Sequence, residues 1–241
     1  MKKNTLVVNG SPHGKKGVTY MLQRQFVRGA ENAGAEVDEV FLNKKKISPC
    51  LGCFTCWIQT PGNCVIRDDQ AELLEKLLWA DIFVLATPVY VDGITGQSKV
   101  FLDRTVPLLK PEITFREDHC RHPSRRNKAS KFAVISNCGF HEVDNFDSLV
   151  MHCRKFCLNM NAEYAGHLLR PHGPVLRYPE MMAGEIKKVL EAAEKAGEEL
   201  VRQGRISHAS MEAVSAEIVP KRAYVEAANF FWRQELEKIG Q

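Results

Sequence analysis

The sequence predicts an α/β protein with a doubly wound, five-stranded parallel sheet, followed by a C-terminal helical arm. Short apolar runs alternate with helical patterns along most of the chain, and the residues after about 205 fall outside this alternation. The run over residues 81–87 is apolar almost throughout, which is typical of a strand covered on both faces. Right-handed crossovers between such strands place helices on both sides of the sheet.

The expected elements follow one another in a regular order. Strands are expected at residues 5–9, 36–42, 81–87, 132–136 and 162–169, with helices over about 17–33, from 68, over 96–109, over 146–161 and around 186–200. A strand that is followed each time by a helix favours a parallel sheet. We therefore assign residues 1–205 to one domain and residues 206–241 to a helical extension. In that extension, residues 224–236 carry aromatics expected to pack on the body or on a second subunit.

Composition indicates an ordinary globular protein, with 44% hydrophobic residues, 26% charged residues and a net charge of +4. No apolar run is long enough to cross a bilayer, and the N-terminus lacks the features of a signal peptide, so we expect a cytoplasmic protein without a membrane partner. The long polar connection over 111–128 and the overlapping basic segment 121–131 predict a solvated loop or lid, and the basic residues could attract an anionic nucleotide or an acidic electron-transfer partner. Aromatics are not interleaved with the basic residues, which argues against a nucleic-acid partner.

The first strand runs into a glycine-rich loop, residues 10–19. Its glycines allow a tight turn, and the helix that follows offers free N–H groups and a dipole that favour a phosphate. Ser11 and Thr19 can add hydroxyl donors. A plain turn between strand and helix is the alternative, because the loop matches neither the Walker pattern nor the dinucleotide pattern.

Segments after three of the strands resemble those of the NADPH-dependent FMN reductases. Gly10-Ser11-Pro12 with Gly17 and Thr19 resembles that family's phosphate loop. Residues 87–90 with Gly93 resemble its second loop, which lies along the flavin ring, and residues 136–140 resemble its third loop. The resemblance covers about residues 1–205. It implies a flavodoxin-like sheet with strand order 2-1-3-4-5.

The resemblance also implies an FMN site made by these three loops. The implied cofactor-binding residues are Ser11, His13, Gly17, Val18, Thr19, Pro88, Val89, Tyr90, Gly93, Asn137, Cys138 and Gly139. His13 and Val18 depart from the family, which commonly has Arg at the first position and Asn or Ser at the second. Because backbone N–H groups can still hold the phosphate, we expect weaker FMN binding rather than none.

Four of the eight cysteines crowd into one segment, at Cys50, Cys53, Cys56 and Cys64. Three cysteines at two-residue spacing, with a fourth from a nearby turn, are able to ligate a cubane cluster. Tetrahedral zinc, a redox thiol pair, a disulfide and plain reduced cysteines are the alternatives. The pattern resembles the iron–sulfur flavoproteins, a branch of the same group. That resemblance implies a [4Fe–4S] cluster and a homodimer or homotetramer.

These features lead to three hypotheses for function. The resemblance implies an FMN-dependent oxidoreductase that takes a hydride from NADPH or NADH and passes electrons to free flavin, a quinone or another small acceptor. Flavin carries that chemistry, so no catalytic side chain is expected. The second hypothesis is an electron carrier between protein partners, and the third is a binding protein that has lost the flavin.

Overall fold

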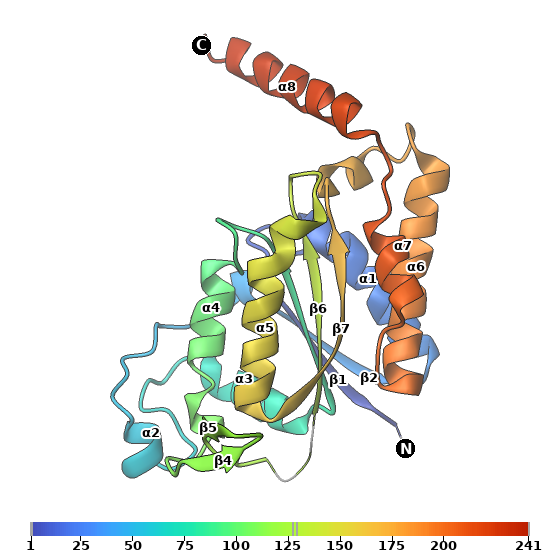
Figure 1. Ribbon diagram of the computed structural model, residues 1–241. Helices are drawn as coiled ribbons and strands as arrows, with labels where there is room; N and C mark the ends of the chain where they lie inside the picture. The colour runs from blue at the N-terminus through green and yellow to red at the C-terminus, as the bar shows by residue number, and fades with distance from the viewer. Residues whose placement is uncertain (1, 127, 129, 241) are drawn as a thin grey trace.

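The structure, a computed structural model, describes residues 2–126, 128 and 130–240. Its centre is a parallel sheet in the order β2-β1-β3-β6-β7 (Figure 1). The five strands are β1 (Asn4–Asn9), β2 (Glu36–Phe41), β3 (Ile82–Pro88), β6 (Ser130–Asn137) and β7 (Ala162–Arg170). Numbered among themselves, they have the predicted order 2-1-3-4-5, so the flavodoxin-like fold is confirmed.

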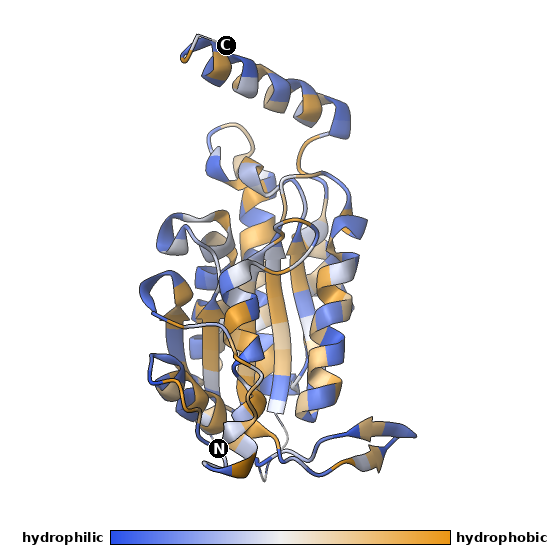
Figure 2. Ribbon diagram, turned by 90° about the vertical axis from the view of Figure 1, so that its left-hand side faces the viewer, coloured by the Kyte–Doolittle hydropathy of each residue, from blue (hydrophilic) through white to orange (hydrophobic). Residues whose placement is uncertain are grey.

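Helices cover both faces of the sheet, which explains the unbroken apolar strands. Helices α1 (Val18–Asn32) and α6 (Ala183–Gln203) pack on one face, and α3 (Gln70–Trp79), α4 (Gly96–Asp103) and α5 (Asp147–Met160) pack on the other. Side chains alternate between the two cores: Val7 of β1 joins the first, while Leu6 and Val8 join the second. Figure 2 shows the central strands as a mainly hydrophobic band between these layers.

Helix α4 is shorter than the sequence pattern predicts. The expected helix over 96–109 ends at Asp103, with Arg104 as its C-cap, and a short 3-10 turn follows at Val106–Leu108. Pro107 explains the early end, because proline lacks a backbone N–H and disfavours the helical conformation in the residue before it.

The central part of the polar connection over 111–128 has a regular structure that the sequence analysis did not predict. Strands β4 (Thr114–Arg116) and β5 (His119–Arg121) form an antiparallel hairpin there. Its two turn residues, Glu117 and Asp118, both have positive φ, at 53° and 59°, as a tight hairpin turn requires. Neither is glycine or asparagine, so the usual turn signal is missing from the sequence. Residues 127 and 129 of this basic segment lie outside the described residues.

The two C-terminal helices differ in how they contact the body of the protein. Helix α7 (His208–Ser215) packs on α6 and β7, and Val214 and Ile218 join the core. Helix α8 (Lys221–Glu237) has no buried residue and projects from the body (Figure 1). Among the described residues, no helix combines the length and the apolar character needed to span a membrane.

Candidate functional site

The loops after β1, β3 and β6 come together at the carboxyl edge of the sheet. The Gly10 amide donates to the carbonyl of Ala86 at 2.7 Å, and the Val89 amide donates to that of Asn137 at 2.9 Å. The Thr19 hydroxyl, in the first turn of α1, donates to Oδ1 of Asn137 at 2.6 Å. Segments more than 100 residues apart in sequence therefore meet where parallel α/β sheets bind ligands.

The first loop leaves the start of α1 open. Gly17 is the N-cap, and no side chain among the described residues accepts a hydrogen bond from the first turn of α1. Ser11 and Thr19 are buried beside this helix end, whereas His13 is exposed. Free amides at a helix N-terminus favour an anion, so this end of α1 suits a phosphate group.

A strained turn shapes the second loop. Tyr90 and Gly93 exchange backbone hydrogen bonds of 2.9 and 3.2 Å, and the two residues between them have positive φ. One is Val91, at φ 46°. For a β-branched residue this conformation costs about 1–2 kcal/mol, and such strain is concentrated at functional sites. The turn leaves Tyr90 and Val91 exposed at the edge of the sheet.

The third loop carries a buried thiol and an exposed glycine. The Cys138 thiol donates to the Phe140 carbonyl at 3.2 Å, and burial raises the pKa of Cys138. The thiol lies in a small apolar cluster with Phe146 and Leu169, where a neutral cysteine packs as a small hydrophobic residue. Gly139 is exposed, and its carbonyl accepts a hydrogen bond from the Tyr224 hydroxyl of α8.

A fourth segment at this edge, the 3-10 turn Gly173–Arg177 after β7, is one that the sequence analysis missed. A Cβ on Gly173 would lie 3.1 Å from Cβ of Asn137 and 3.2 Å from Cγ1 of Val18, so the turn contacts two predicted loops. Arg177 donates to the Lys16 carbonyl at 3.3 Å and adds positive charge beside the first loop. Only a histidine-glycine-proline sequence marks this turn, which is not a specific signal.

The four clustered cysteines line one small cavity of about 120 Å³. Cys50 and Cys53 are exposed, Cys64 is half-buried and Cys56 is buried. Burial raises the pKa of Cys56, and the three other thiols add to this effect. The rest of the wall is apolar except for Asp103 and Arg104. All four cysteines therefore border the same cavity.

The thiols surround this cavity rather than a single point. Across residues 2–126, 128 and 130–240, no three His, Cys, Asp or Glu side chains are arranged to hold one metal ion. Tetrahedral zinc needs four ligands that converge on one ion. In a cubane cluster each thiolate binds a different iron atom, so a cluster needs thiols spread around its own volume rather than converging on one point.

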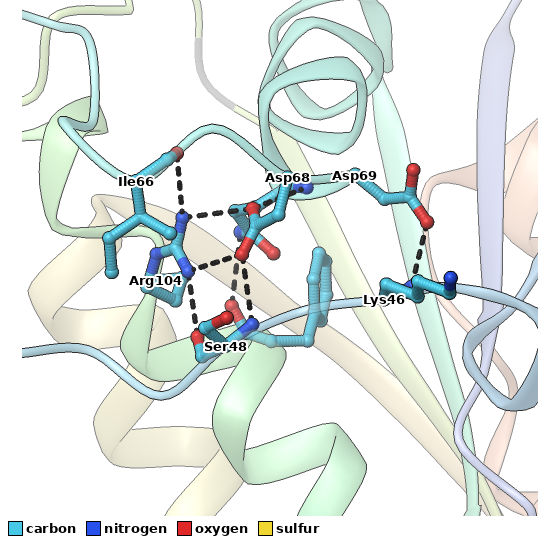
Figure 3. A network of polar contacts seen from close by, with 8 residues as sticks. Lys46, Ser48, Ile66, Asp68, Asp69 and Arg104 are labelled. Carbon is cyan, nitrogen blue, oxygen red and sulfur yellow. Dashed lines mark hydrogen bonds and ion pairs between the residues drawn. The ribbon is translucent and has the colours of Figure 1, made fainter.

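A buried ion pair between Arg104 and Asp68 anchors the cysteine loop, residues 47–67 (Figure 3). Arg104, 1% exposed, contacts the Asp68 carboxylate at 2.9 and 3.0 Å and donates to the carbonyls of Ser48 and Ile66. Burial alone would raise the pKa of Asp68, but hydrogen bonds from Arg104 and two backbone amides hold that pKa below its ordinary value. Burial alone would lower the pKa of Arg104, and Asp68 together with Cys64 raises it. The guanidinium thus ties both ends of the loop together.

Helix α4 separates the two candidate sites. At its N-terminal end, the Thr95 hydroxyl donates to the Gly10 carbonyl at 2.7 Å, beside the first loop. Its C-terminal end leads to Arg104 and the cysteine cavity. An eight-residue helix is about 12 Å long, so the loop edge and the cysteine cavity lie at opposite ends of an element of that length.

A larger cavity, of about 560 Å³, lies elsewhere, between β2 and α3. Carboxylates dominate its lining, which includes Glu36, Asp38 and Glu72. Such a surface repels a phosphate, and none of the predicted site residues contributes to it. The chemistry therefore points to the loop edge and the cysteine cavity.

Comparison with known proteins agrees with this geometry. Residues 4–128 match the model of a family described as NADPH-dependent FMN reductase. The chain belongs to the NADPH-dependent FMN reductase family. The matched segment contains the first two loops and all four clustered cysteines.

Two iron–sulfur flavoproteins are among the similar curated proteins. The chain is 37% identical over 101 residues to one from Methanocaldococcus jannaschii, a match that covers 42% of this chain and 51% of that protein. It is 41% identical over 98 residues to one from Archaeoglobus fulgidus, which covers 41% of this chain and 43% of that protein. The chain therefore matches about half the length of these relatives.

Solved structures share the fold over more of the chain. An FMN-dependent NADH-azoreductase from Bacillus anthracis in complex with FMN superposes with a TM-score of 0.63 at 15% identity. The superposition covers 84% of this chain and 100% of that one. At this level of identity, the similarity extends the family's fold to β6 and β7 without assigning an activity.

Proposed function

We propose that this member of the FMN reductase family binds FMN at the carboxyl edge of its sheet and is an NAD(P)H-dependent oxidoreductase. The observation that carries the proposal is the meeting of three loops around the open N-terminus of α1. The first-turn amides of α1 and the hydroxyls of Ser11 and Thr19 would hold the phosphate. The second and third loops, with exposed Tyr90 and Gly139, would position the ring.

The chain's own groups fit a binding and orienting role. Bound FMN would supply the chemistry, since flavin accepts a hydride from a nicotinamide and can release electrons singly. The protein would hold the phosphate, present the ring to the donor and leave one side open at the exposed edge. Arg177 and the lysines of the first loop would attract the phosphates of NADPH or NADH. The acceptor would be a small molecule such as a quinone or free flavin.

Thr19→Val is expected to weaken FMN binding by about tenfold or more. In the free chain the Thr19 hydroxyl donates to Oδ1 of Asn137; on binding it would turn to the phosphate, and a hydroxyl hydrogen bond to a charged group contributes about 1.5–3 kcal/mol. Titration of the purified protein with FMN, followed by quenching of flavin fluorescence, measures the change. Thr114→Val is the matched control, since it removes an exposed hydroxyl of the hairpin. Equal affinities for the two variants would contradict the role of Thr19. No saturable binding by the wild type would contradict the flavin site itself.

A second candidate function rests on the cysteine cavity. Four thiols around one apolar cavity suit a [4Fe–4S] cluster held by Cys50, Cys53, Cys56 and Cys64. With flavin and cluster together, the chain would convert a two-electron donor into single electrons for a protein partner. Steady-state NAD(P)H oxidation with small acceptors, compared with reduction of an electron-transfer protein, separates this carrier role from the first proposal.

Anaerobically purified protein is expected to contain about four iron atoms and four sulfides per chain. Cys56→Ser is expected to lower both values by more than half, because the buried thiol is the least replaceable ligand. Cys120→Ser removes an exposed thiol of the hairpin and is expected to change neither value. Iron well below four per chain in the wild type, or the same loss in both variants, would contradict the cluster.

A further inference from the structure

Helix α8 presents an apolar face that the rest of the chain leaves uncovered. Val225, Trp232 and Leu236 follow helical spacing and Ile239 lies in the turn just past the helix; the four are 45%, 62%, 44% and 69% exposed. The 17-residue helix has no buried residue and touches the body only near its start, where Tyr224 bonds to Gly139 and Lys221 pairs with Glu142. Figures 1 and 2 show it standing away from the sheet and its covering helices. A single helix of this length is marginal in water, so its face calls for a partner.

We propose that two copies of α8 pair antiparallel about a two-fold axis and join two chains into a dimer. The charges beside the apolar face carry this assignment. Glu226 and Arg233 are seven residues apart, so both lie along the same side of the apolar face of α8. In an antiparallel pair about a two-fold axis, each flank meets the same flank of the other helix. Opposite charges spaced in this way attract when the helix meets a copy of itself.

The register of the apolar face agrees with that of the charges. Pairing Val225 with the partner's Leu236 also pairs Asn229 with the partner's Trp232. The same alignment sets Glu226 beside the partner's Arg233, and the symmetry repeats each contact. One offset therefore forms the two apolar Val225–Leu236 contacts, places each Trp232 over the partner's Asn229, and forms both ion pairs.

A second copy fits this face better than a lipid surface does. Between residues 221 and 238 the helix carries Lys221, Arg222, Arg233 and Lys238 against Glu226, Glu235 and Glu237. Helices that lie on membranes are usually rich in lysine and arginine on the polar face, and this near balance is not. The pairing also places the partner's helix beside the start of α8, where the Tyr224 hydroxyl contacts the third loop. The dimer would thus cover one border of the candidate flavin edge.

Charge reversal with analytical ultracentrifugation tests the pairing on the full chain. Glu226→Arg and Arg233→Glu each create two like-charge contacts across the axis, and each is expected to weaken association by about tenfold or more and to halve the mass of the assembly. An equimolar mixture of the two variants is expected to recover the wild-type mass, because every pair in the mixed dimer is opposite in charge. The double variant Glu226→Arg/Arg233→Glu should recover it as well.

Lys238→Glu is the matched control, since it makes the same charge change as Arg233→Glu on another side of the helix and is expected to leave the mass unchanged. Circular dichroism checks that every variant keeps its helix content. A monomeric wild type, single variants with the wild-type mass, or a mixture that stays dissociated would each overturn the proposal. Binding of a monomeric wild type to anionic vesicles would assign the face to lipid instead.

Discussion

Arg104→Gln is expected to lower the free energy of unfolding by about 3–5 kcal/mol, because it leaves a largely buried carboxylate without its partner. The Asp68 side chain is only 9% exposed, and its strongest hydrogen bonds come from the lost guanidinium. Denaturant unfolding of the two proteins measures the difference. Arg67→Gln, at the exposed neighbouring position, is the control and should stay within about 0.5 kcal/mol of the wild type.

The effect of Arg104→Gln should depend on pH in a defined direction. The folded-state pKa of Asp68 is depressed, so its stabilising contribution is present above the unfolded carboxyl pKa, about 4, and is lost as the pH falls through the folded-state value. The difference between wild type and variant should therefore be largest near neutral pH and shrink below about pH 4. A difference under 1 kcal/mol, or one that is constant from neutral to acid pH, would contradict the role of this pair.

The same substitution should loosen the cysteine loop. Arg104 and Asp68 bind both ends of the loop, at Ser48 and Ile66. Hydrogen exchange measured by mass spectrometry should therefore rise over residues 47–67 in the variant and stay unchanged in α1. Faster exchange spread equally over the whole chain would indicate a general loss of stability instead.

Gly29→Ala is expected to destabilise the protein by about 3 kcal/mol, although alanine is the better helix former by about 1 kcal/mol. Helices α1 and α6 cross with their backbones almost in contact. A Cβ on Gly29 would lie 1.8 Å from the Glu194 carbonyl oxygen, and one on Gly197 would lie 2.0 Å from that of Phe26. The blocking atoms belong to the backbone, so no side chain can rotate away and the helices have to separate.

Gly184→Ala provides the control for this prediction. It makes the same change in α6, where no atom lies within 4 Å of the new Cβ, and it should leave stability unchanged or raise it by up to about 1 kcal/mol. Thermal and denaturant unfolding of the two variants show which effect dominates at position 29, the higher helix propensity of alanine or the close packing of α1 on α6. Equal stabilisation by both substitutions would show that the close crossing does not limit the fold.

Local sequence patterns predicted the elements that form the sheet. Continuous apolar runs marked the central strands, because strands buried on both faces have no polar side. Periodic apolar residues marked α1, α3 and α6, and the alternation of strand and helix led to the parallel order. The loops after β1, β3 and β6 could be found because the carboxyl ends of parallel strands share one edge. The boundary between residues 205 and 206 stays a prediction.

Long-range contacts account for what these patterns missed. Asp68 accepts the Gln70 amide at the start of α3, but its main partner is Arg104, 36 residues away. Nothing near Arg104 in the sequence indicates that a folded loop will bury it. The contact of the turn after β7 with the first loop was missed for the same reason.

The sequence by itself determined the order of the strands, the edge at which the loops gather and the grouping of four cysteines, because each depends on nearby residues or on the rules of parallel sheets. Tertiary structure alone decided that Gly29 and Gly197 let two helices touch, and that Arg104 holds the cysteine loop. It also decided that α4 separates the two candidate sites and that α8 stands free. These features depend on which distant surfaces meet, and packing settles that only when the whole chain has folded.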